Sequence, residues 1–250
     1  MKRLQLLSGL LVVAGFFAVT PAEAGRIVVA NDEWTLSNPG YSGPNDPAVF
    51  ALNVASWFTG GGTGSFFAYS TNFGLTQSSL AATMTGGGHT WATGTGITWD
   101  LPTLLTYDGI FLAGDAVPST AVLVDYVNAG GNVYLAGGTG IGGPVAEAAR
   151  WNPFLNAFGL GFGDFYNGVA GDIAIASAHP LFAGVDHLYQ NNGNNALDIN
   201  VSDPQSAVLV SLGGNGLYAV YDPVPVPEPG TMLLMGLGLG ALGARRRFRR

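Results

Sequence analysis

The chain offers three histidines as candidates for acid–base or metal chemistry: His89, His179 and His187. His179 lies close to Asp186-His187 and to Ser177, so a serine, a histidine and an aspartate can be assembled there on paper. No G-x-S-x-G segment supplies the sharp turn that exposes a nucleophilic serine. The spacing of His179, Asp186 and His187 matches no standard zinc pattern. We therefore predict no catalytic residue, no metal ligand and no cofactor, and we interpret these side chains as loop residues.

A second set of oxygen ligands comes from Asp198, Asn200 and Asp203. Carboxylate and amide oxygens at short spacing can hold Ca²⁺, but the regular spacing of an EF-hand loop is absent. Solvated turn residues are the favoured interpretation, and a calcium loop is the alternative.

A glycine-rich loop at residues 137–143 follows an apolar run and precedes a helical pattern. That is where a phosphate-binding loop would lie. The loop lacks the Lys-Ser/Thr pair of a P-loop and the spacing of a G-x-G-x-x-G motif, so we expect a tight turn. Phosphate binding is the alternative.

The elements that must position these residues follow from hydrophobic periodicity. Short apolar runs predict strands at residues 26–30, 65–69, 109–113, 132–136, 173–175, 207–210 and 217–220. Helical spacing predicts helices at residues 48–58, 78–84, 120–127 and 144–158, with Pro153 breaking or kinking the last of them.

The segment 107–138 is the best-defined part of this pattern. It predicts a strand, a helix that begins after Ser119, and a second strand, which together form a βαβ unit. Both strands are almost wholly apolar, as in a parallel sheet covered on both faces. The glycine-rich segment 213–216 predicts a closing antiparallel hairpin. We therefore expect an α/β fold in which helices sandwich a mostly parallel sheet, in one domain over residues 25–222.

Charge and cysteine content limit what this domain can do. Residues 26–222 contain two basic residues, Arg26 and Arg150, against 14 acidic ones, which gives a formal charge of −12. Nucleic acid is a poor partner, because phosphate binding needs clustered lysines or arginines. The chain has no cysteine, so disulfides, thiolate metal sites and a cysteine nucleophile are excluded.

Residues 1–24 have the three parts of a secretory signal peptide. Lys2 and Arg3 give a positive start, residues 4–19 are apolar, and Ala22-Glu23-Ala24 precedes Gly25 as the small-x-small pattern that signal peptidase reads. We predict cleavage between Ala24 and Gly25, with export of the rest of the chain.

The C-terminal segment has three parts of its own. Residues 223–230 form an extended proline-rich spacer that contains Val226, Pro227, Glu228 and Pro229. Residues 231–244 carry no charge, and a basic cluster follows at Arg245, Arg246, Arg247, Arg249 and Arg250. As a helix the 14 uncharged residues would span about 21 Å, against a hydrocarbon core of roughly 30 Å. We therefore predict a short transmembrane helix in residues 231–250 that is marginal as a permanent anchor, with its arginines on the cytoplasmic side.

The order of these three parts resembles the PEP-CTERM sorting signal. The resemblance rests on Val226-Pro227-Glu228-Pro229, the short apolar segment and the terminal arginines, and it covers about the last 25 residues. It implies recognition by the membrane protease-transpeptidase exosortase, which cuts near the Pro-Glu-Pro motif. It also implies a Gram-negative source that makes exopolysaccharide. An ordinary C-terminal anchor is the alternative, and it also places the domain outside the membrane.

The domain itself distantly resembles glutamine-amidotransferase-like domains of flavodoxin type. The resemblance is carried by residues 107–115, 124–134 and 179–185, the last of which reads His-Pro-Leu-Phe-Ala-Gly-Val. In catalytic members a cysteine stands at the turn after the strand that corresponds to residues 132–136. Gly137, Gly138 and Thr139 occupy that turn here, so the resemblance carries the fold but not the activity.

Three hypotheses for function remain. The first is a non-enzymatic envelope or matrix protein, held briefly in the inner membrane and then released to the surface or exopolysaccharide. The second is a secreted hydrolase of envelope glycans or esters. The third is a carbohydrate-binding module, in which exposed tryptophans among Trp34, Trp57, Trp91, Trp99 and Trp151 would stack on sugars. The first is favoured, with signal peptidase, exosortase, the inner membrane and exopolysaccharide as its partners.

Overall fold

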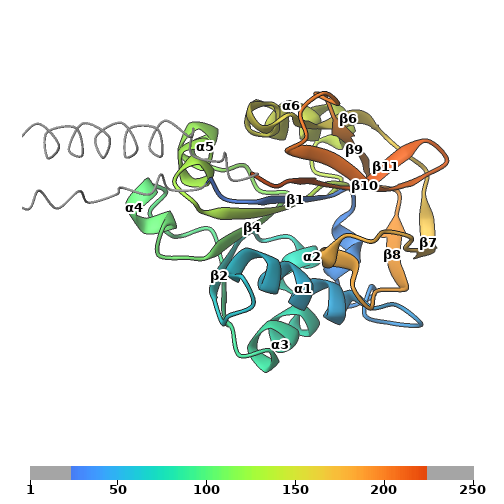
Figure 1. Ribbon diagram of the computed structural model, residues 1–250, viewed down its shortest axis with the longest axis horizontal. Coiled ribbons are helices and arrows are strands. Elements are labelled where there is room, and N and C mark those ends of the chain that lie inside the picture. The colour runs from blue at the N-terminus through green and yellow to red at the C-terminus, as the bar shows by residue number, and fades with distance from the viewer. Residues whose placement is uncertain (1–23, 224–250) are drawn as a thin grey trace, which may run out of the picture.

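The computed structural model describes residues 24–223, which fold around a central seven-stranded sheet (Figure 1). The strand order is β10-β11-β1-β5-β4-β2-β3. Five strands are parallel: β1 (Ile27–Ala30), β5 (Asn132–Ala136), β4 (Gly109–Ala113), β2 (Ser65–Tyr69) and β3 (Thr90–Thr93). The hairpin of β10 (Ser206–Leu212) and β11 (Asn215–Tyr221) adds two antiparallel strands beside β1. The predicted α/β class with a mostly parallel sheet is therefore confirmed.

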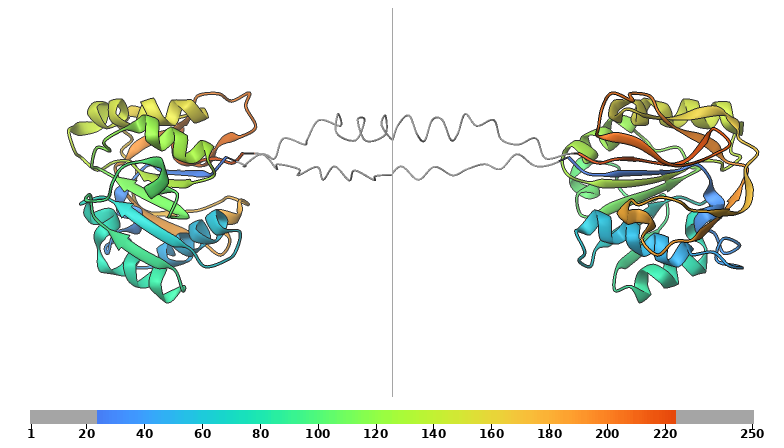
Figure 2. Two further views of the ribbon diagram at one scale, coloured as in Figure 1. Left: turned by 90° about the vertical axis from the view of Figure 1, so that its left-hand side faces the viewer. Right: turned by 45° about the vertical axis from the view of Figure 1, so that its right-hand side comes forward.

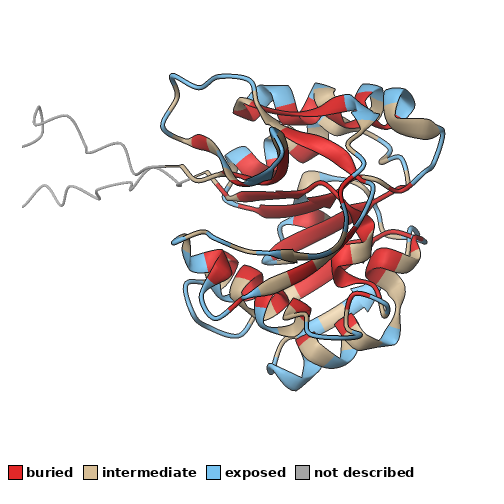
Figure 3. Cartoon of the chain, turned by 90° about the vertical axis from the view of Figure 1, so that its right-hand side faces the viewer, coloured by how far each residue is buried: buried red, intermediate tan, exposed pale blue. Residues whose placement is uncertain are grey.

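Helices cover both faces of the sheet (Figure 2). One face packs against α1 (Pro47–Thr59) and α3 (Ser78–Gly86), and the short helix α2 (Phe73–Thr76) lies on the same side. The other face packs against α4 (Leu101–Leu104), α5 (Thr120–Asn128) and α6 (Gly143–Leu155). The central strands are therefore enclosed between two helical layers, which explains why β1, β4 and β5 are buried along their whole length. Figure 3 shows the buried middle of the sheet in red.

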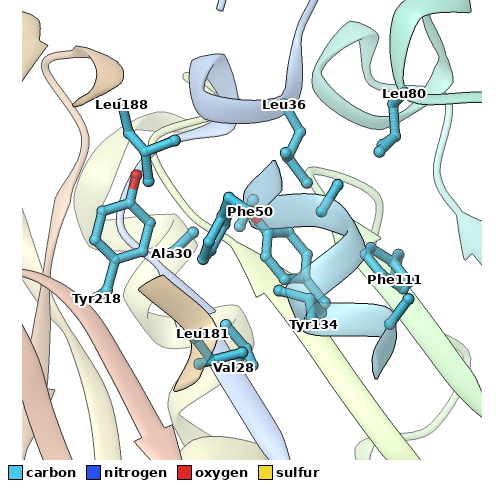
Figure 4. Packing of buried hydrophobic residues seen from close by; sticks show 14 of the residues in the cluster. Val28, Ala30, Leu36, Phe50, Leu80, Phe111, Tyr134, Leu181, Leu188 and Tyr218 are labelled. Atoms are coloured by element: carbon cyan, nitrogen blue, oxygen red, sulfur yellow. The ribbon is translucent and has the colours of Figure 1, made fainter. Parts of the chain in front are cut away.

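The core on the α1 side is rich in aromatic side chains (Figure 4). Phe50 of α1 stacks on Phe182 with ring centroids 5.4 Å apart, and its ring meets Tyr218 of β11 edge to face at the same distance. Phe111 and Tyr134, on neighbouring strands, stack at 4.9 Å. Each such buried ring stabilises the fold by roughly 1.5–3 kcal/mol through loss of exposed apolar surface. These contacts tie α1 to the middle of the sheet.

The predicted βαβ unit is present as β4, α5 and β5. Its two strands pair in parallel from Gly109 opposite Asn132 to Ala113 opposite Ala136. The side chain of Ser119 accepts a hydrogen bond from the backbone N–H of Val122 and so caps α5, as expected. The predicted β10–β11 hairpin is also confirmed.

The strand order differs from the flavodoxin order, 2-1-3-4-5, that the resemblance implied. The chain crosses from β1 to β2 over two empty positions, and β4 and β5 later fill these as the chain returns. β1 therefore has β5 and β11 as neighbours. A periodicity pattern predicts each strand but contains no information on which strand it will pair with.

Several smaller elements differ from the sequence prediction. The polar segment 71–100 contributes the edge strand β3, which exists because it pairs with β2. Helix α6 continues through Pro153 to Leu155 and ends in a 3₁₀ turn, η2 (Asn156–Phe158). The strand predicted at 173–175 is β7 (Ala170–Ala174), which pairs with β8 (His187–Asn191) outside the central sheet. A second pair joins β6 (Leu160–Tyr166) to β9 (Asn194–Asp198).

Both ends of the described chain meet at one edge of the sheet, where the parallel strands begin. Ile27 of β1 lies opposite Tyr221 of β11, and the Arg26 guanidinium forms an ion pair with Asp222 at 3.1 Å. We call this the amino edge, and the edge where the parallel strands finish the carboxyl edge. Within residues 24–223 no helix combines the length and apolarity needed to span a bilayer, and the transmembrane segment predicted in residues 231–250 lies outside the described residues.

Candidate functional site

The carboxyl edge contains the switch point of the sheet, between β1 and β5. The helix reached from β1, α1, packs on the face that holds Val28 and Ala30. The helix that follows β5, α6, packs on the opposite face with Val133 and Leu135. The two loops therefore diverge from neighbouring strands, and in open α/β sheets such a point is where ligands bind.

Two carboxyl groups follow β1 directly. Asp32 is fully buried and accepts hydrogen bonds from the backbone N–H groups of Trp34 and Asn191, which join the β1 loop to the end of β8. Burial raises the pKa of Asp32 to about 6, although these hydrogen bonds act in the opposite direction. The group therefore changes charge just below neutral pH.

Glu33 points toward the loop that follows β2. Its carboxyl group accepts a hydrogen bond from the side-chain amide of Asn72, which also caps α2 by accepting from the backbone N–H of Gly74 at 2.7 Å. Burial raises the pKa of Glu33 to about 7, and the neighbouring carboxyl groups of Asp32 and Glu147 add to the rise. The carboxyl group of Glu33 therefore ionises at a higher pH than that of an exposed glutamate.

Glu147 reaches the same edge from the first turns of α6. The backbone N–H of Thr139 donates to Glu147 Oε1 at 3.0 Å, and the Thr139 hydroxyl donates to the same oxygen. Glu147 is fully buried, and burial raises its pKa. The guanidinium of Arg150 acts in the opposite direction but is bonded to the carbonyl oxygens of Gly114 and Ile141. No ion pair joins Arg150 to these acids within residues 24–223.

Buried polar atoms without a hydrogen-bond partner gather around these carboxyl groups. Both side-chain atoms of Asn31 and the Oε2 atom of Glu147 have none among the described residues. Gly193 lies against Asn31, and a Cβ at residue 193 would come within 2.8 Å of Asn31 Nδ2. Buried polar groups in folded proteins are nearly always bonded, so the Asn31 and Glu147 atoms have hydrogen-bonding capacity left for a ligand or water.

The chemistry that these carboxyl groups suit is proton exchange. In the described part of the chain, no three or more histidine, aspartate or glutamate side chains are grouped so as to hold a metal ion. Asp32, Glu33 and Glu147 instead carry raised pKa values at the end of two neighbouring strands. Asp32 and Glu33, whose pKa values rise to about 6 and about 7, can give or take a proton near neutral pH.

Two backbone amides of the glycine-rich loop 137–143 are hydrogen-bonded to side chains of the domain. The Gly138 N–H donates to Asn194 Oδ1 at 3.0 Å and the Thr139 N–H to Glu147, so both amides already have acceptors. Gly138 has φ +68°, and a Cβ there would lie 2.7 Å from Gly193 Cα, so this position requires glycine. The loop is a tight turn packed against β1, as expected.

The histidine region lies elsewhere and has structural contacts. His179 Nδ1 accepts from the Leu181 N–H at 3.3 Å and caps the short helix η3 (Pro180–Phe182), while the ring packs on Trp57 at 5.4 Å. The backbone N–H groups of Asp186 and His187 both donate to Asp46 Oδ2. Burial lowers the pKa of His179. Of the three side chains that the sequence suggested as a triad, Ser177 accepts from the His179 N–H and His179 caps η3, while Asp186 contributes its backbone N–H to the bond with Asp46.

Asp198, Asn200 and Asp203 also take part in turns. Asp198 Oδ1 accepts from the Asn200 N–H at 2.9 Å and the Ser206 hydroxyl at 3.0 Å, and Asp203 Oδ1 accepts from the Gln205 N–H at 3.0 Å. These bonds agree with the interpretation as turn residues.

Sequence reasoning missed the carboxyl groups that the fold brings together. Asn31, Asp32 and Glu33 directly follow the strand predicted at residues 26–30, and polar residues at that end of a parallel strand are a known signal for a site. Glu147 carries a weaker signal, because it is a single acid on the helix face that also holds Trp151 and Phe154.

The predicted processing residues fall mainly outside the described chain. Ala22, the motif Val226-Pro227-Glu228-Pro229 and the basic cluster all lie there, and their roles remain predictions; the cluster comprises Arg245, Arg246, Arg247, Arg249 and Arg250. Ala24 and Gly25 are described. The Gly25 N–H donates to the Val127 carbonyl at the end of α5, at 2.6 Å.

Comparison with known proteins identifies one segment. Residues 225–247 match the PEP-CTERM protein-sorting motif. No curated protein and no solved structure matches the chain. The sorting-signal resemblance is therefore confirmed, whereas the amidotransferase-like resemblance of the domain finds no support in these comparisons.

Proposed function

We propose that this chain is an exported, non-enzymatic envelope or matrix protein that exosortase processes at its C-terminal signal. The PEP-CTERM motif at residues 225–247 carries the proposal, since it implies processing by exosortase and export to the cell envelope. The proposal adds that an N-terminal signal peptide is removed at Gly25. It also adds that the folded residues are anchored only briefly in the inner membrane and then join the surface or the exopolysaccharide.

The geometry of the amino edge supports removal of both terminal segments from the folded domain. Gly25 and Asp222 leave the fold at the same edge, on either side of the β1–β11 pair. Both processing segments therefore join the domain at one end, where cutting either of them leaves the sheet intact. The carboxyl edge lies at the other end of the parallel strands, away from the anchor.

The net charge of the domain also supports the proposed location outside the cell. Residues 26–222 have a formal charge of −12, which favours solubility outside the cell and disfavours binding to anionic surfaces. His179 uses its Nδ1 atom to cap η3, which supports a structural role for this ring.

A secreted hydrolase is the second candidate, and one observation favours it. Glu33 and Glu147 are buried carboxyl groups with raised pKa values at the switch point of the sheet, where general acids and bases are found in many enzymes. In that case the Thr139 hydroxyl, bonded to Glu147, would be the group activated. Cells producing Glu33→Gln or Glu147→Gln should keep the wild-type surface phenotype under the first proposal and lose it under the second.

The sorting part of the proposal is tested in the motif itself. Replacing Pro227, Glu228 and Pro229 together by alanine should leave the protein in the inner-membrane fraction, as should deletion of the exosortase gene. Asp222→Asn is the matched control, because it changes a nearby acid outside the motif. Release of the triple variant at the wild-type level would overturn the proposal.

A further inference from the structure

A surface groove of about 650 Å³ lies beside the carboxyl edge on the α1 side of the sheet. Its lining includes Asn38, Pro39, Ser42, Gln77, Asp172 and Tyr189. These residues come from the segment after β1, the segment before α3 and the β7–β8 pair, so three parts of the chain form its walls. We call it the Asn38–Tyr189 groove. Its volume is in the range of ligand pockets, roughly 300–1,000 Å³.

Hydrogen bonds fix the walls of this groove. The Asn38 N–H donates to Gln77 Oε1 at 2.6 Å, and Asn38 Oδ1 accepts from the Ser79 N–H at 3.0 Å. Across the groove, Asn45 Nδ2 donates to Asp172 Oδ1 at 2.8 Å. The groove is therefore formed before any ligand arrives, which lowers the entropic cost of binding.

One aromatic ring, that of Tyr189, lines the groove, and two further rings pack behind it in series. Tyr189 lines the groove and is only half-buried, and its ring meets Trp34 edge to face at 6.3 Å. Trp34, also half-buried, meets Phe73 at 4.9 Å. A partly exposed ring beside side-chain amides and a carboxylate is a surface on which the C–H face of a sugar can pack while its hydroxyl groups form hydrogen bonds.

The charges in and around the groove limit the class of ligand that it can bind. Asp172 is the charged residue of the lining, and its exposed carboxylate has acceptor positions beyond the one that Asn45 uses. The arginines of the body are elsewhere: Arg26 is bonded to Asp222 and Trp57, and Arg150 to Gly114. An anionic polymer would find no cation here and would meet the −12 charge of the domain.

A smaller groove, of about 360 Å³, lies at the amino edge and provides a contrast. It is lined by Arg26, Asn53, Trp57 and Pro180 among others. The Asn53 amide donates to the carbonyl oxygens of Leu181 and Ala183, so its amide nitrogen, like the Arg26 guanidinium, is already bonded. In the larger groove, Asp172 and Gln77 each use one side-chain oxygen in the bonds described above, which leaves Asp172 Oδ2 and Gln77 Nε2 for a ligand.

We propose that the Asn38–Tyr189 groove binds an uncharged oligosaccharide segment, with Tyr189 packing on a sugar ring and Asp172 and Gln77 holding its hydroxyl groups. The inference rests on the proposed function, because it requires that the domain of residues 25–222 is delivered to a surface or matrix that contains glycans. It goes further in naming a site and in selecting neutral over anionic glycans.

The test uses the mature protein recovered from the cell exterior, so that sorting does not affect the result. In affinity gel electrophoresis, neutral polysaccharides such as dextran, xylan and galactomannan are the probes, and alginate and polygalacturonate are the anionic counterparts. At least one neutral probe should retard the protein, and the anionic probes should not. Asp172→Ala and Tyr189→Ala should each weaken the retardation by tenfold or more.

Matched variants at the far side of the molecule control for charge and for loss of an aromatic ring. Asp125→Ala removes an exposed acid on α5, and Tyr107→Ala removes a half-buried tyrosine; both should bind as wild type. If Tyr189→Ala fails to fold, the loss of retardation in Asp172→Ala and Gln77→Ala tests the groove assignment. No retardation by any neutral probe, or equal retardation of the Asp172 variant, would overturn the groove assignment while leaving the sorting proposal intact. The sorting proposal is tested separately, by membrane fractionation of the variant in which Pro227, Glu228 and Pro229 are replaced by alanine.

Discussion

The two edges of the sheet are built from the same strands but differ in how their polar groups are satisfied. At the amino edge, Arg26 bonds to Asp222 and to the Trp57 carbonyl, and its guanidinium lies 5.0 Å from the Trp57 ring. The Asn132 side chain accepts from the Arg26 N–H and donates to the Asp108 carbonyl. At the carboxyl edge, buried carboxyl groups stand beside polar atoms that have no partner in residues 24–223. One edge is closed by its own contacts, and the other retains binding capacity at a cost in stability.

The largest effect should come from breaking the amino edge at Gly25. A Cβ at this residue would lie 1.9 Å from the Gly131 carbonyl oxygen, and neither backbone can yield easily. Gly25→Ala should therefore lower the free energy of unfolding by about 3 kcal/mol or more, measured by urea denaturation of the mature protein. Gly86→Ala is the matched control, since nothing lies within 4 Å of its added Cβ. Equal stability of the two variants would mean that Gly25 is not packed as described.

The next effect concerns the carboxyl edge and pH. A carboxyl group whose pKa is higher in the folded state than in the unfolded state stabilises the fold below its unfolded pKa, and this stability is lost as pH rises through the folded value. For Asp32, with a pKa raised from 3.8 to about 6, the loss between about pH 4 and pH 7 is roughly 3 kcal/mol. Glu33, with a pKa of about 7, extends the same loss toward pH 8.

Asp32→Asn/Glu33→Gln should therefore flatten the decline in thermal midpoint between pH 5 and pH 8. Burial lowers the pKa of His89 and His179, so these groups make stability rise with pH over the same range, and comparison with wild type removes their contribution. His179→Ala in both backgrounds serves as a check. An unchanged pH slope in the double variant would show that the two carboxyl groups are not buried together.

A smaller effect is expected from the ion pair of the amino edge. Arg26→Ala should cost about 1–2 kcal/mol in unfolding free energy, because it removes the contact with the Trp57 ring and the bond to its carbonyl as well as the charge. Asp222→Asn should cost no more than about 0.5 kcal/mol, because the pair is partly exposed, at 36% and 43%. Chemical denaturation of both variants measures the difference, and a larger cost for Asp222→Asn would contradict this account.

Local elements could be predicted from the sequence because they depend on neighbouring residues. Ser119 caps α5 and the apolar runs of β4 and β5 pair as expected, since the helix and both strands lie within one short segment. The order β1-β5-β4-β2 could not be predicted, because it depends on contacts between distant segments.

The carboxyl-edge site shows the same limit. Asp32, Glu33 and Glu147 lie more than 110 residues apart at their extremes and meet only because β1 and β5 are neighbours. The histidine region, by contrast, was prominent in the sequence because its residues are close along the chain, yet the fold uses His179 as a helix cap. Proximity in sequence was a poor guide to a shared site in this chain.

The proposed processing determines where the mature protein begins and ends. Intact mass spectrometry of the protein recovered outside the cell should give a species that starts at Gly25 and ends near Pro227-Glu228-Pro229, without the apolar segment and the terminal arginines. A recovered protein that still ends at Arg250, or still carries residues 1–24, would contradict it.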